Sequence, residues 1–168
     1  MDDTKQFKHG VRILVIDDDP VIYDLYCDIL AQEGYELIFA SNARVGLTQL
    51  EQEYFDLVLL DLKLPDMYGT DVAKEISINH PNVSVIIVTG NPTSESMLEA
   101  IKAGAYDYII KPFYVDDFKI SIRRVVEKIV LTKENQRLSQ ELLDKEKQLE
   151  ERVKLLEQEI DRLKNNKH

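Results

Sequence analysis

The feature of this sequence that most limits its fold is a regular alternation of short apolar runs with segments of helical spacing. The apolar runs, interpreted as strands, cover residues 11–16, 35–40, 56–60, 83–88 and 106–110. The segments with apolar residues three or four apart, interpreted as helices, cover 20–34, 43–53, 69–79 and 93–103, and a last helix begins near Val115. This alternation predicts an α/β fold, a doubly wound five-stranded parallel sheet covered by helices on both faces.

Reactive side chains directly follow four of the five predicted strands. In chain order they are Asp17, Asp18 and Asp19, then Asp61, then Thr89, and finally Lys111. Because ligands of parallel sheets collect at the carboxyl ends of the strands, we expect these side chains to meet at one edge. Converging carboxylates repel each other, and a hard divalent cation such as Mg²⁺ relieves that repulsion. With an amine and a hydroxyl nearby, the pattern suits a phosphoryl group, and Asp61 is the candidate nucleophile that would form an aspartyl-phosphate.

Each of these acids also has an ordinary structural explanation. A single aspartate after an apolar strand, such as Asp61, is ordinarily explained as a turn residue or a helix cap. Asp19 precedes Pro20, which is typical of a helix N-cap followed by proline, and we assign Asp19 to capping. Asp66 is interpreted as a turn residue, with Gly69 closing the turn. Only the combination of the side chains at the four strand ends favours a reactive site.

Four motifs at these strand ends resemble those of the receiver domain of the two-component response-regulator family. They are ILVIDDDP at 13–20, LVLLDLKLPDMYG at 57–69, IIVTG at 86–90 and DYIIKPF at 107–113. The resemblance covers about residues 10–131 and implies a flavodoxin-like receiver fold. It also implies phosphorelay signal transduction, in which the receiver accepts a phosphoryl group from a histidine kinase or a phosphotransfer protein.

The resemblance implies a role for each residue of the site. Asp61 would be the phosphoacceptor, and Asp18 and Asp61 would hold Mg²⁺ directly. Asp17 would reach the metal through water, and the main-chain carbonyl of Lys63 would be the remaining protein ligand.

The same resemblance assigns the residues that surround the phosphoryl group. Lys111 would pair with its oxygens, and Thr89 would donate a hydrogen bond to one of them. Tyr108 matches the aromatic switch residue that turns inward when the threonine moves. The bond between Lys111 and Pro112 is a cis peptide bond in the family.

Two other classes of function remain open. An aspartyl-phosphate phosphatase also uses a strand-end aspartate and Mg²⁺, but it would need a second acid at the position that Lys63 occupies. A structural protein with an inert receiver is disfavoured because Asp61, Thr89 and Lys111 are all present. We therefore expect no enzyme activity beyond Mg²⁺-dependent self-phosphorylation from phosphodonors and self-dephosphorylation.

The last predicted helix contains no glycine or proline after Val115 and would be roughly 75 Å long up to Lys164. Leucine recurs every seven residues within it, and Val153 and Ile160 lie between the later leucines. The repeated residues are Leu142, Leu149, Leu156 and Leu163. Leucine at heptad position d with β-branched residues at position a favours a parallel two-stranded coiled coil. We therefore interpret residues 132–165 as a dimeric coiled-coil extension, continuous with the last helix of a receiver domain at 10–131.

Charges beside this apolar seam favour pairing of two copies in register. Opposite charges meet between positions g and e in three pairs, Lys145 with Glu150, Arg152 with Glu157, and Glu159 with Lys164. Each exposed pair contributes only about 0.2–1 kcal/mol, so such pairs select register more than they stabilise. Upstream, Leu131, Asn135 and Leu138 continue a seam in another phase, which places a four-residue stutter near Glu146. A lone solvated helix, or a linker to a further domain, remains the alternative.

The distribution of charge bears on partners and location. The formal net charge is −10, and residues 132–168 hold equal numbers of acidic and basic side chains, so the acidic excess lies in residues 1–131. An acidic domain is a poor candidate for direct nucleic-acid binding. No apolar run approaches the roughly 18 residues of a spanning helix, so we expect a cytoplasmic protein without membrane contact. The sequence does not indicate the cognate kinase, the input signal or the output.

Overall fold

The computed structural model describes residues 10–30 and 32–165, and strands alternate with helices as predicted. The strands are β1 (Arg12–Ile16), β2 (Glu36–Ala40), β3 (Leu57–Leu60), β4 (Ser84–Thr89) and β5 (Asp107–Ile110). The helices are α1 (Pro20–Leu30), α2 (Ala43–Gln52), α3 (Gly69–Asn79), α4 (Ser94–Lys102) and α5 (Val115–Asn165). α1 ends before the predicted limit of residue 34, because the chain already turns there and Gly34 has a φ of 76°.

The sheet is parallel throughout, and its strand order is β2-β1-β3-β4-β5. This is the order of flavodoxin-like doubly wound proteins, so the predicted fold class is confirmed. The direction in which successive strands are added reverses beside β1, and ligands of such sheets bind at the carboxyl ends of the strands next to that point.

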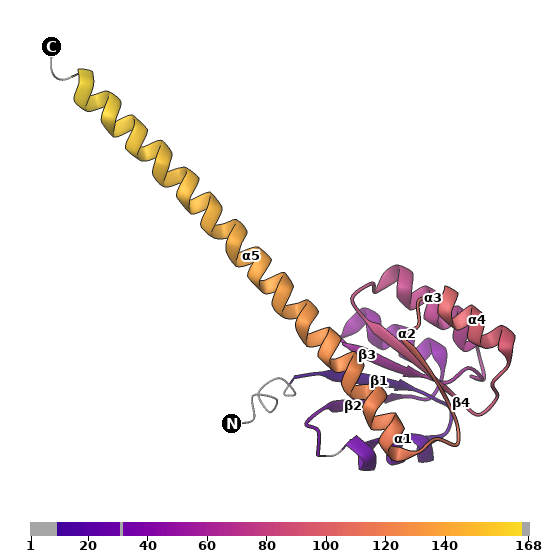
Figure 1. The fold of residues 1–168 in the computed structure, drawn as a ribbon. Coiled ribbons are helices and arrows are strands. Elements are labelled where there is room, and N and C mark those ends of the chain that lie inside the picture. The colour runs from indigo at the N-terminus through magenta and orange to yellow at the C-terminus, as the bar shows by residue number, and fades with distance from the viewer. Residues whose placement is uncertain (1–9, 31, 166–168) are drawn as a thin grey trace. The chain divides into compact units, whose positions relative to one another are not determined.

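The apolar strands supply core residues to both faces of the sheet. On one face, Leu14 and Leu60 belong to a buried cluster that α2, α3 and α4 complete, for example with Ile76. On the other face, the ring of Tyr26 in α1 stacks on that of Phe118 in α5, with the ring centroids 5.0 Å apart. Figure 1 shows α1 and the first turns of α5 on the side of the sheet opposite α2, α3 and α4. The sheet is therefore the middle of three layers.

The chain divides into two units, one that ends at Ile129 and one that begins at Val130. α5 contributes to both. Its buried side chains all lie between Phe118 and Ile129, and in the described part of the second unit no side chain is buried. Among the residues that the structure describes, no helix has the length and apolarity needed to cross a membrane.

Candidate functional site

The strand ladder positions the predicted site residues at the carboxyl edge of the sheet. The backbone N–H of Asp17 donates to the last carbonyl of β2 at 3.1 Å, and that of Asp61 to the last carbonyl of β1 at 2.9 Å. The N–H of Lys111 donates to the last carbonyl of β4 at 2.8 Å. Because these bonds extend the strand pairing by one residue, the three side chains leave the sheet at the same edge.

Three carboxylates form the centre of the site. One oxygen from each of Asp17, Asp18 and Asp61 lies within 4.8 Å of the others. Asp17 is only 4% exposed, Asp18 is exposed, and Asp61 is intermediate, so the cluster has one side toward solvent. Hard oxygen donors on a partly solvated site fit a divalent cation that keeps some of its water, as Mg²⁺ does.

Lys63 contacts the same cluster through its main chain. Its N–H donates to Oδ2 of Asp61 at 3.2 Å, and Lys63 also forms an isolated antiparallel bridge with Tyr68. The contacts therefore place Lys63 beside Asp61, while the proposed use of its carbonyl as a metal ligand stays a prediction.

Lys111 brings a positive charge between two of the carboxylates. Its Nζ lies 2.7 Å from Oδ2 of Asp17 and 3.9 Å from Oδ1 of Asp61. The peptide bond to Pro112 is cis, as the resemblance implied. An ammonium at this distance from Asp61 is within reach of an anionic group attached to that carboxylate.

The environment of Asp61 makes its negative charge costly. Burial is the largest influence and raises the pKa of Asp61, the Lys111 ammonium acts in the opposite direction, and the charge of Asp17 raises the pKa further. Backbone N–H groups of Lys63 and Leu62 lower it without reversing the shift. A cation bound beside Asp61 would compensate the charge that its surroundings leave poorly stabilised.

Gly69, the first residue of α3, allows the helix to lie directly on the Asp61 loop. A Cβ at Gly69 would be 2.4 Å from the carbonyl oxygen of Asp61 and 2.7 Å from the Cα of Leu62. The Gly69 N–H also donates to the Leu62 carbonyl at 2.8 Å. The glycine predicted to close a turn is thus required by close backbone contact with Asp61 and Leu62.

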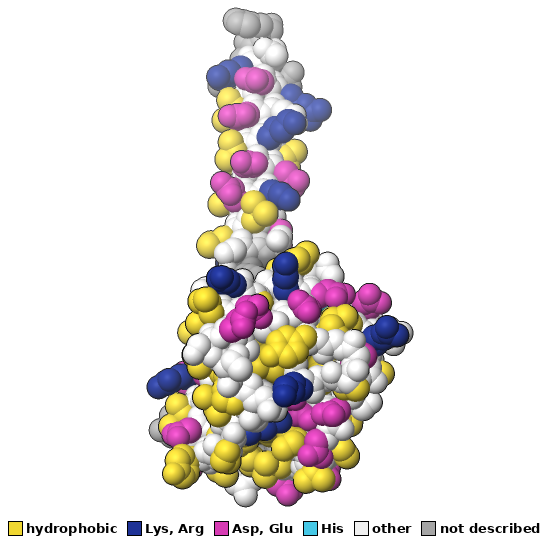
Figure 2. Space-filling model, turned by 90° about the vertical axis from the view of Figure 1, so that its right-hand side faces the viewer, with side chains coloured by type: hydrophobic (Ala, Val, Ile, Leu, Met, Phe, Trp, Pro, Cys, Tyr) yellow, Lys and Arg dark blue, Asp and Glu magenta, His cyan; other side chains and the backbone are white. Residues whose placement is uncertain are grey.

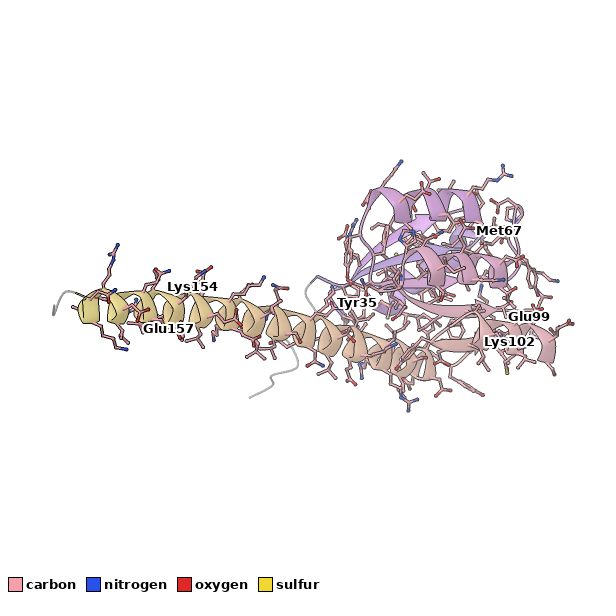
Figure 3. All side chains as sticks on the ribbon, turned by 90° about the horizontal axis from the view of Figure 1, so that it is seen from above. Tyr35, Met67, Glu99, Lys102, Lys154 and Glu157 are labelled. Atoms are coloured by element: carbon pink, nitrogen blue, oxygen red, sulfur yellow. The ribbon has the colours of Figure 1, made fainter. Side chains whose placement is uncertain are left out.

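Asp66 does more than the predicted turn role. Its two carboxylate oxygens accept hydrogen bonds from the backbone N–H groups of Ala43 and Arg44, at 3.0 and 2.9 Å, at the start of α2. Burial is the largest single influence and would raise the pKa of Asp66, but these two N–H groups, the N–H of Asp66 itself and the charge of Arg44 together lower the pKa. Met67, labelled in Figure 3, packs against the core from the same loop. The Asp61 loop is therefore fixed to α2 as well as to α3.

Thr89 ends β4 and is fully buried, with 0% of its surface exposed. Its hydroxyl oxygen accepts a hydrogen bond from the N–H of Asn91 at 3.2 Å. The contact that the structure gives this hydroxyl is thus within its own β4–α4 loop, and its predicted bond to a phosphoryl oxygen stays a prediction.

Tyr108 of β5 faces inward and packs against the core cluster. Its hydroxyl lies 3.0 Å from the hydroxyl oxygen of Ser96 in the first turn of α4. On the opposite face of the sheet, burial, followed by the charges of Asp17 and then Asp61, raises the pKa of Tyr26. Tyr26 is therefore a neutral, buried neighbour of the acidic cluster.

Comparisons with known proteins identify the family of this chain. Residues 13–123 match the family model of the response regulator receiver domain. The chain is 32% identical over 131 residues to the regulatory protein AtoC of Escherichia coli, which covers 78% of this chain and 28% of AtoC. The chain thus spans less than a third of the length of that relative.

Solved structures give the same result. A CheY-like receiver domain protein from Methanospirillum hungatei is 39% identical, with a TM-score of 0.68, and the match covers 71% of this chain and 95% of that one. TrrA from Thermotoga maritima, solved in complex with Mg²⁺ and BeF, is 34% identical, with a TM-score of 0.63 and coverage of 68% and 98%.

The fold and the acidic strand-end site define a receiver domain of the kind that serves phosphorelay signalling. The chain belongs to the response regulator receiver domain family of two-component systems. Its sequence indicated that class through four local motifs, whereas the contacts of Asp66 and Ser96 carried no comparable signal. The three-residue spacing of Thr93 and Ser96 is that of a capping box, but this spacing does not identify Tyr108 as the partner of Ser96.

Proposed function

We propose that this protein accepts a phosphoryl group from the phosphohistidine of a histidine kinase or phosphotransfer protein onto Asp61, in an Mg²⁺-dependent reaction in the cytoplasm. The observation that carries the proposal is the meeting of Asp17, Asp18, Asp61 and Lys111 at one sheet edge. Three acids and one amine within this space suit the transfer of a compact, highly charged group better than they suit any purely structural role.

The chemistry follows from the arrangement of the chain's own groups. An oxygen of the ionised Asp61 attacks phosphorus, and the bond from phosphorus to the donor's imidazole nitrogen breaks with its electron pair remaining on that nitrogen. Lys111, already 3.9 Å from Asp61, pairs with the phosphoryl oxygens. Mg²⁺ held by Asp17, Asp18 and Asp61 would supply further positive charge to these oxygens. Thr89 then moves and donates a hydrogen bond from its hydroxyl to a phosphoryl oxygen, and Tyr108 responds to the movement of Thr89.

Phosphorylation with acetyl phosphate tests this function. In the presence of Mg²⁺ the protein should gain the mass of one phosphoryl group, and peptide mapping should place it on Asp61. Asp61→Asn should gain none, because an amide is not a nucleophile of this kind. Asp71→Asn is a matched control that should still gain the mass, since Asp71 is an exposed aspartate in the first turn of α3. Folded protein that gains no mass at Asp61 would contradict the proposal.

We further propose that the second unit forms a parallel, in-register coiled coil with a second copy of the chain. Support comes from apolar side chains on a helix that buries none of them in the described second unit. A groove along the helix is lined mostly by positions a, d, e and g of the predicted heptads, among them Leu142, Leu149 and Val153, together with Lys154 at position b. Figure 2 shows apolar side chains recurring between charged ones along this helix, and Figure 3 shows Lys154 and Glu157 pointing outward from it. A long helix of this composition requires a partner to bury its seam.

Two adjacent leucines provide a test of this dimer. Leu155 and Leu156 are 61% and 47% exposed in the single chain, but only Leu156 lies at a seam position of the heptads. Leu156→Ala should weaken the dimer about tenfold or more, because it removes apolar contacts made only by a packed d residue, and Leu155→Ala should not. Sedimentation equilibrium measures both. Equal effects of the two substitutions, or a monomeric wild-type chain, would rule out the proposed seam.

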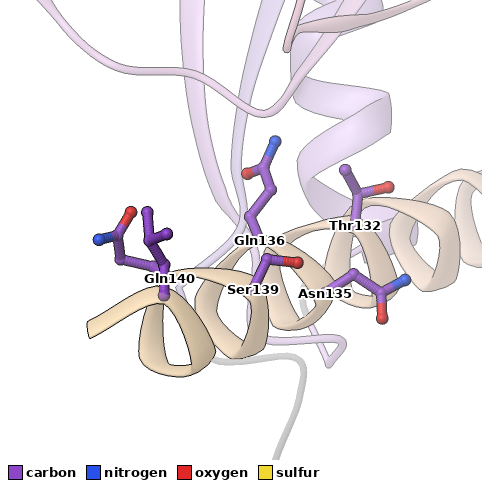
Figure 4. A pocket seen from close by; sticks show the side chains of 6 residues that line it. Thr132, Asn135, Gln136, Ser139 and Gln140 are labelled. Carbon is purple, nitrogen blue, oxygen red and sulfur yellow. The ribbon is translucent and has the colours of Figure 1, made fainter. Parts of the chain in front are cut away.

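Transmission to the coiled coil is proposed to use the continuity of α5. The helix has no interruption between Val115 and Asn165. Its turns after Leu131 carry a polar hollow lined by Thr132, Asn135, Gln136, Ser139, Gln140 and Leu143 (Figure 4). This polar stretch precedes the predicted stutter. We therefore expect the seam to contribute the least apolar packing in the turns through which a rotation of α5 would enter the coiled coil. Glycines inserted after Leu131 should uncouple the two units. An output that still follows phosphorylation would exclude transmission through a rigid helix.

A further inference from the structure

We propose that Ser96 is a positioning residue that holds Tyr108 in its inward orientation and links that orientation to the N-terminus of α4. This inference deepens the proposed function and rests on it, since the link matters for signalling only if Asp61 is phosphorylated. Ser96 has no assigned role in the predicted site, and nothing in its local sequence identifies Tyr108 as its partner.

The Ser96 hydroxyl has its full hydrogen-bonding capacity in use. Its oxygen accepts from the N–H of Thr93 at 3.0 Å, and its proton is directed to the Thr93 carbonyl at 3.0 Å. The Tyr108 hydroxyl lies 3.0 Å from the same oxygen. A serine hydroxyl has one donor and two acceptor positions, so Tyr108 is the donor in the remaining bond.

Burial makes this bond consequential. Ser96 is only 2% exposed, and Tyr108 packs against the core cluster. If Tyr108 turned outward, the Ser96 oxygen would lose one partner in a place that water does not reach freely. The bond therefore favours the inward orientation of the ring by the net free energy of one neutral hydrogen bond.

The same serine belongs to the cap of α4, which connects the bond to the loop that follows Thr89. Thr93 is the N-cap of α4, and its Oγ1 accepts from the N–H of Ser96 at 2.9 Å while the Ser96 side chain caps in return. At the other end of the short β4–α4 loop, the Thr89 hydroxyl holds the N–H of Asn91. A movement of Thr89 and a rotation of Tyr108 therefore act on one short loop from its two ends.

Linkage then predicts the sign of the effect on the site. If the phosphorylated site favours inward Tyr108, anything that holds Tyr108 inward also favours the phosphorylated site, by at most the factor by which it shifts that orientation. Loss of the Ser96 hydroxyl should therefore weaken the apparent affinity for beryllofluoride with Mg²⁺ by about two- to tenfold, the effect of one net neutral hydrogen bond.

The experiment uses the full chain and four single substitutions. Ser96→Ala removes the bond and half of the cap, Tyr108→Phe removes only the bond, and Thr93→Ala removes only the cap. Ser94→Ala is the matched control, because Ser94 is an exposed serine of the same helical turn. Beryllofluoride titrations are followed by calorimetry. The ¹³C signals of labelled tyrosine, with Tyr108 assigned by its loss in Tyr108→Phe, report the ring without any ligand.

The expected result is that Ser96→Ala and Tyr108→Phe weaken beryllofluoride binding similarly, and that the double variant is no weaker than either single one. Ser96→Ala should also move the Tyr108 signal in ligand-free protein, whereas Ser94→Ala should leave it in place.

Three results would overturn the inference: additive effects of the two substitutions, an unchanged Tyr108 signal in Ser96→Ala, or an effect reproduced by Thr93→Ala but absent in Tyr108→Phe. Wild-type protein that binds no beryllofluoride would instead refute the proposed function, while the ligand-free tyrosine signal still decides whether Ser96 positions Tyr108. If Ser96→Ala does not fold, Tyr108→Phe compared with Ser94→Ala decides the binding arm.

Discussion

The two ends of α5 have the same helical geometry, but they differ in whether their apolar side chains are buried within the chain. Up to Ile129 the helix buries residues such as Phe118 and Ile122 against its own chain, and in the described residues from Val130 onward it buries none. The first part is stabilised by tertiary packing within one domain. The second part has apolar side chains at heptad spacing that no described residue of this chain covers. The first part therefore folds as a unimolecular unit, whereas the proposed dimer would make the stability of the second part depend on protein concentration.

The largest expected effect tests the packed end of the helix. Ile122 is 0% exposed and Ile120 is 44% exposed, two residues apart in α5. Ile122→Ala should lower the free energy of unfolding of the receiver unit by about 2–5 kcal/mol, because it leaves a cavity in a packed core. Ile120→Ala should change it by no more than about 0.5 kcal/mol. Urea denaturation measures both, and similar losses would mean that this end of α5 is not packed as described.

A second effect concerns the close approach of α3 to the Asp61 loop. Gly69→Ala should destabilise the receiver unit by about 1–3 kcal/mol, because its Cβ would lie 2.4 Å from the backbone of Asp61. Gly90→Ala is the control, since a Cβ there would meet nothing closer than the Cβ of Lys111 at 4.0 Å. Thermal unfolding gives the stability, and phosphorylation from acetyl phosphate shows whether the shifted loop still presents Asp61. A harmless Gly69→Ala would show that the loop has room that the structure does not give it.

The contact between Asp66 and α2 should have a smaller effect. Asp66→Ala removes the acceptor for two N–H groups at the start of α2 and should cost about 1 kcal/mol, as loss of a helix cap does. Glu51→Ala, an exposed position of the same helix, should be neutral within about 0.5 kcal/mol. Hydrogen exchange of the first turn of α2 locates the change. Unchanged protection of that turn would contradict the assigned contact.

The smallest effect is a pH dependence of opposite sign for two aspartates on one loop. The folded-state pKa of Asp61 is raised, so its ionisation destabilises the fold as pH rises through that pKa, and Asp61→Asn should stabilise the receiver near pH 7 more than near pH 3. The pKa of Asp66 is lowered, so the stability it contributes is present above its unfolded pKa and is lost as pH falls. Asp66→Asn should therefore destabilise near pH 7 and have little effect near pH 3.

Melting curves without Mg²⁺ measure both substitutions, and the helical signal of the second unit should respond to neither. If the two substitutions followed pH in the same direction, the two carboxylates would not have the different surroundings that the structure gives them.

Local patterns were enough to predict the receiver fold and the side chains that meet at its acidic edge. Apolar runs such as 57–60 and 83–88 mark buried parallel strands because such strands lack the alternation of half-exposed ones. The residue after each strand lies at the site because parallel strands all end on the same edge. For this reason the sequence predicts that Asp17, Asp61 and Lys111 lie close together. The assignment of Asp19 to capping agrees with the bond from the Val21 N–H to its carboxylate at 2.9 Å.

The sequence by itself determined the order of the elements, the identity of the reactive groups and the heptad spacing of the second unit, because each depends on neighbours along the chain. Only the tertiary structure decided that Asp66 binds the start of α2, that Gly69 lies on the Asp61 backbone, and that Ser96 receives the Tyr108 hydroxyl. These contacts join residues from separate elements. Their geometry depends on how the helices and loops pack against the sheet, and no periodicity along the chain encodes that packing.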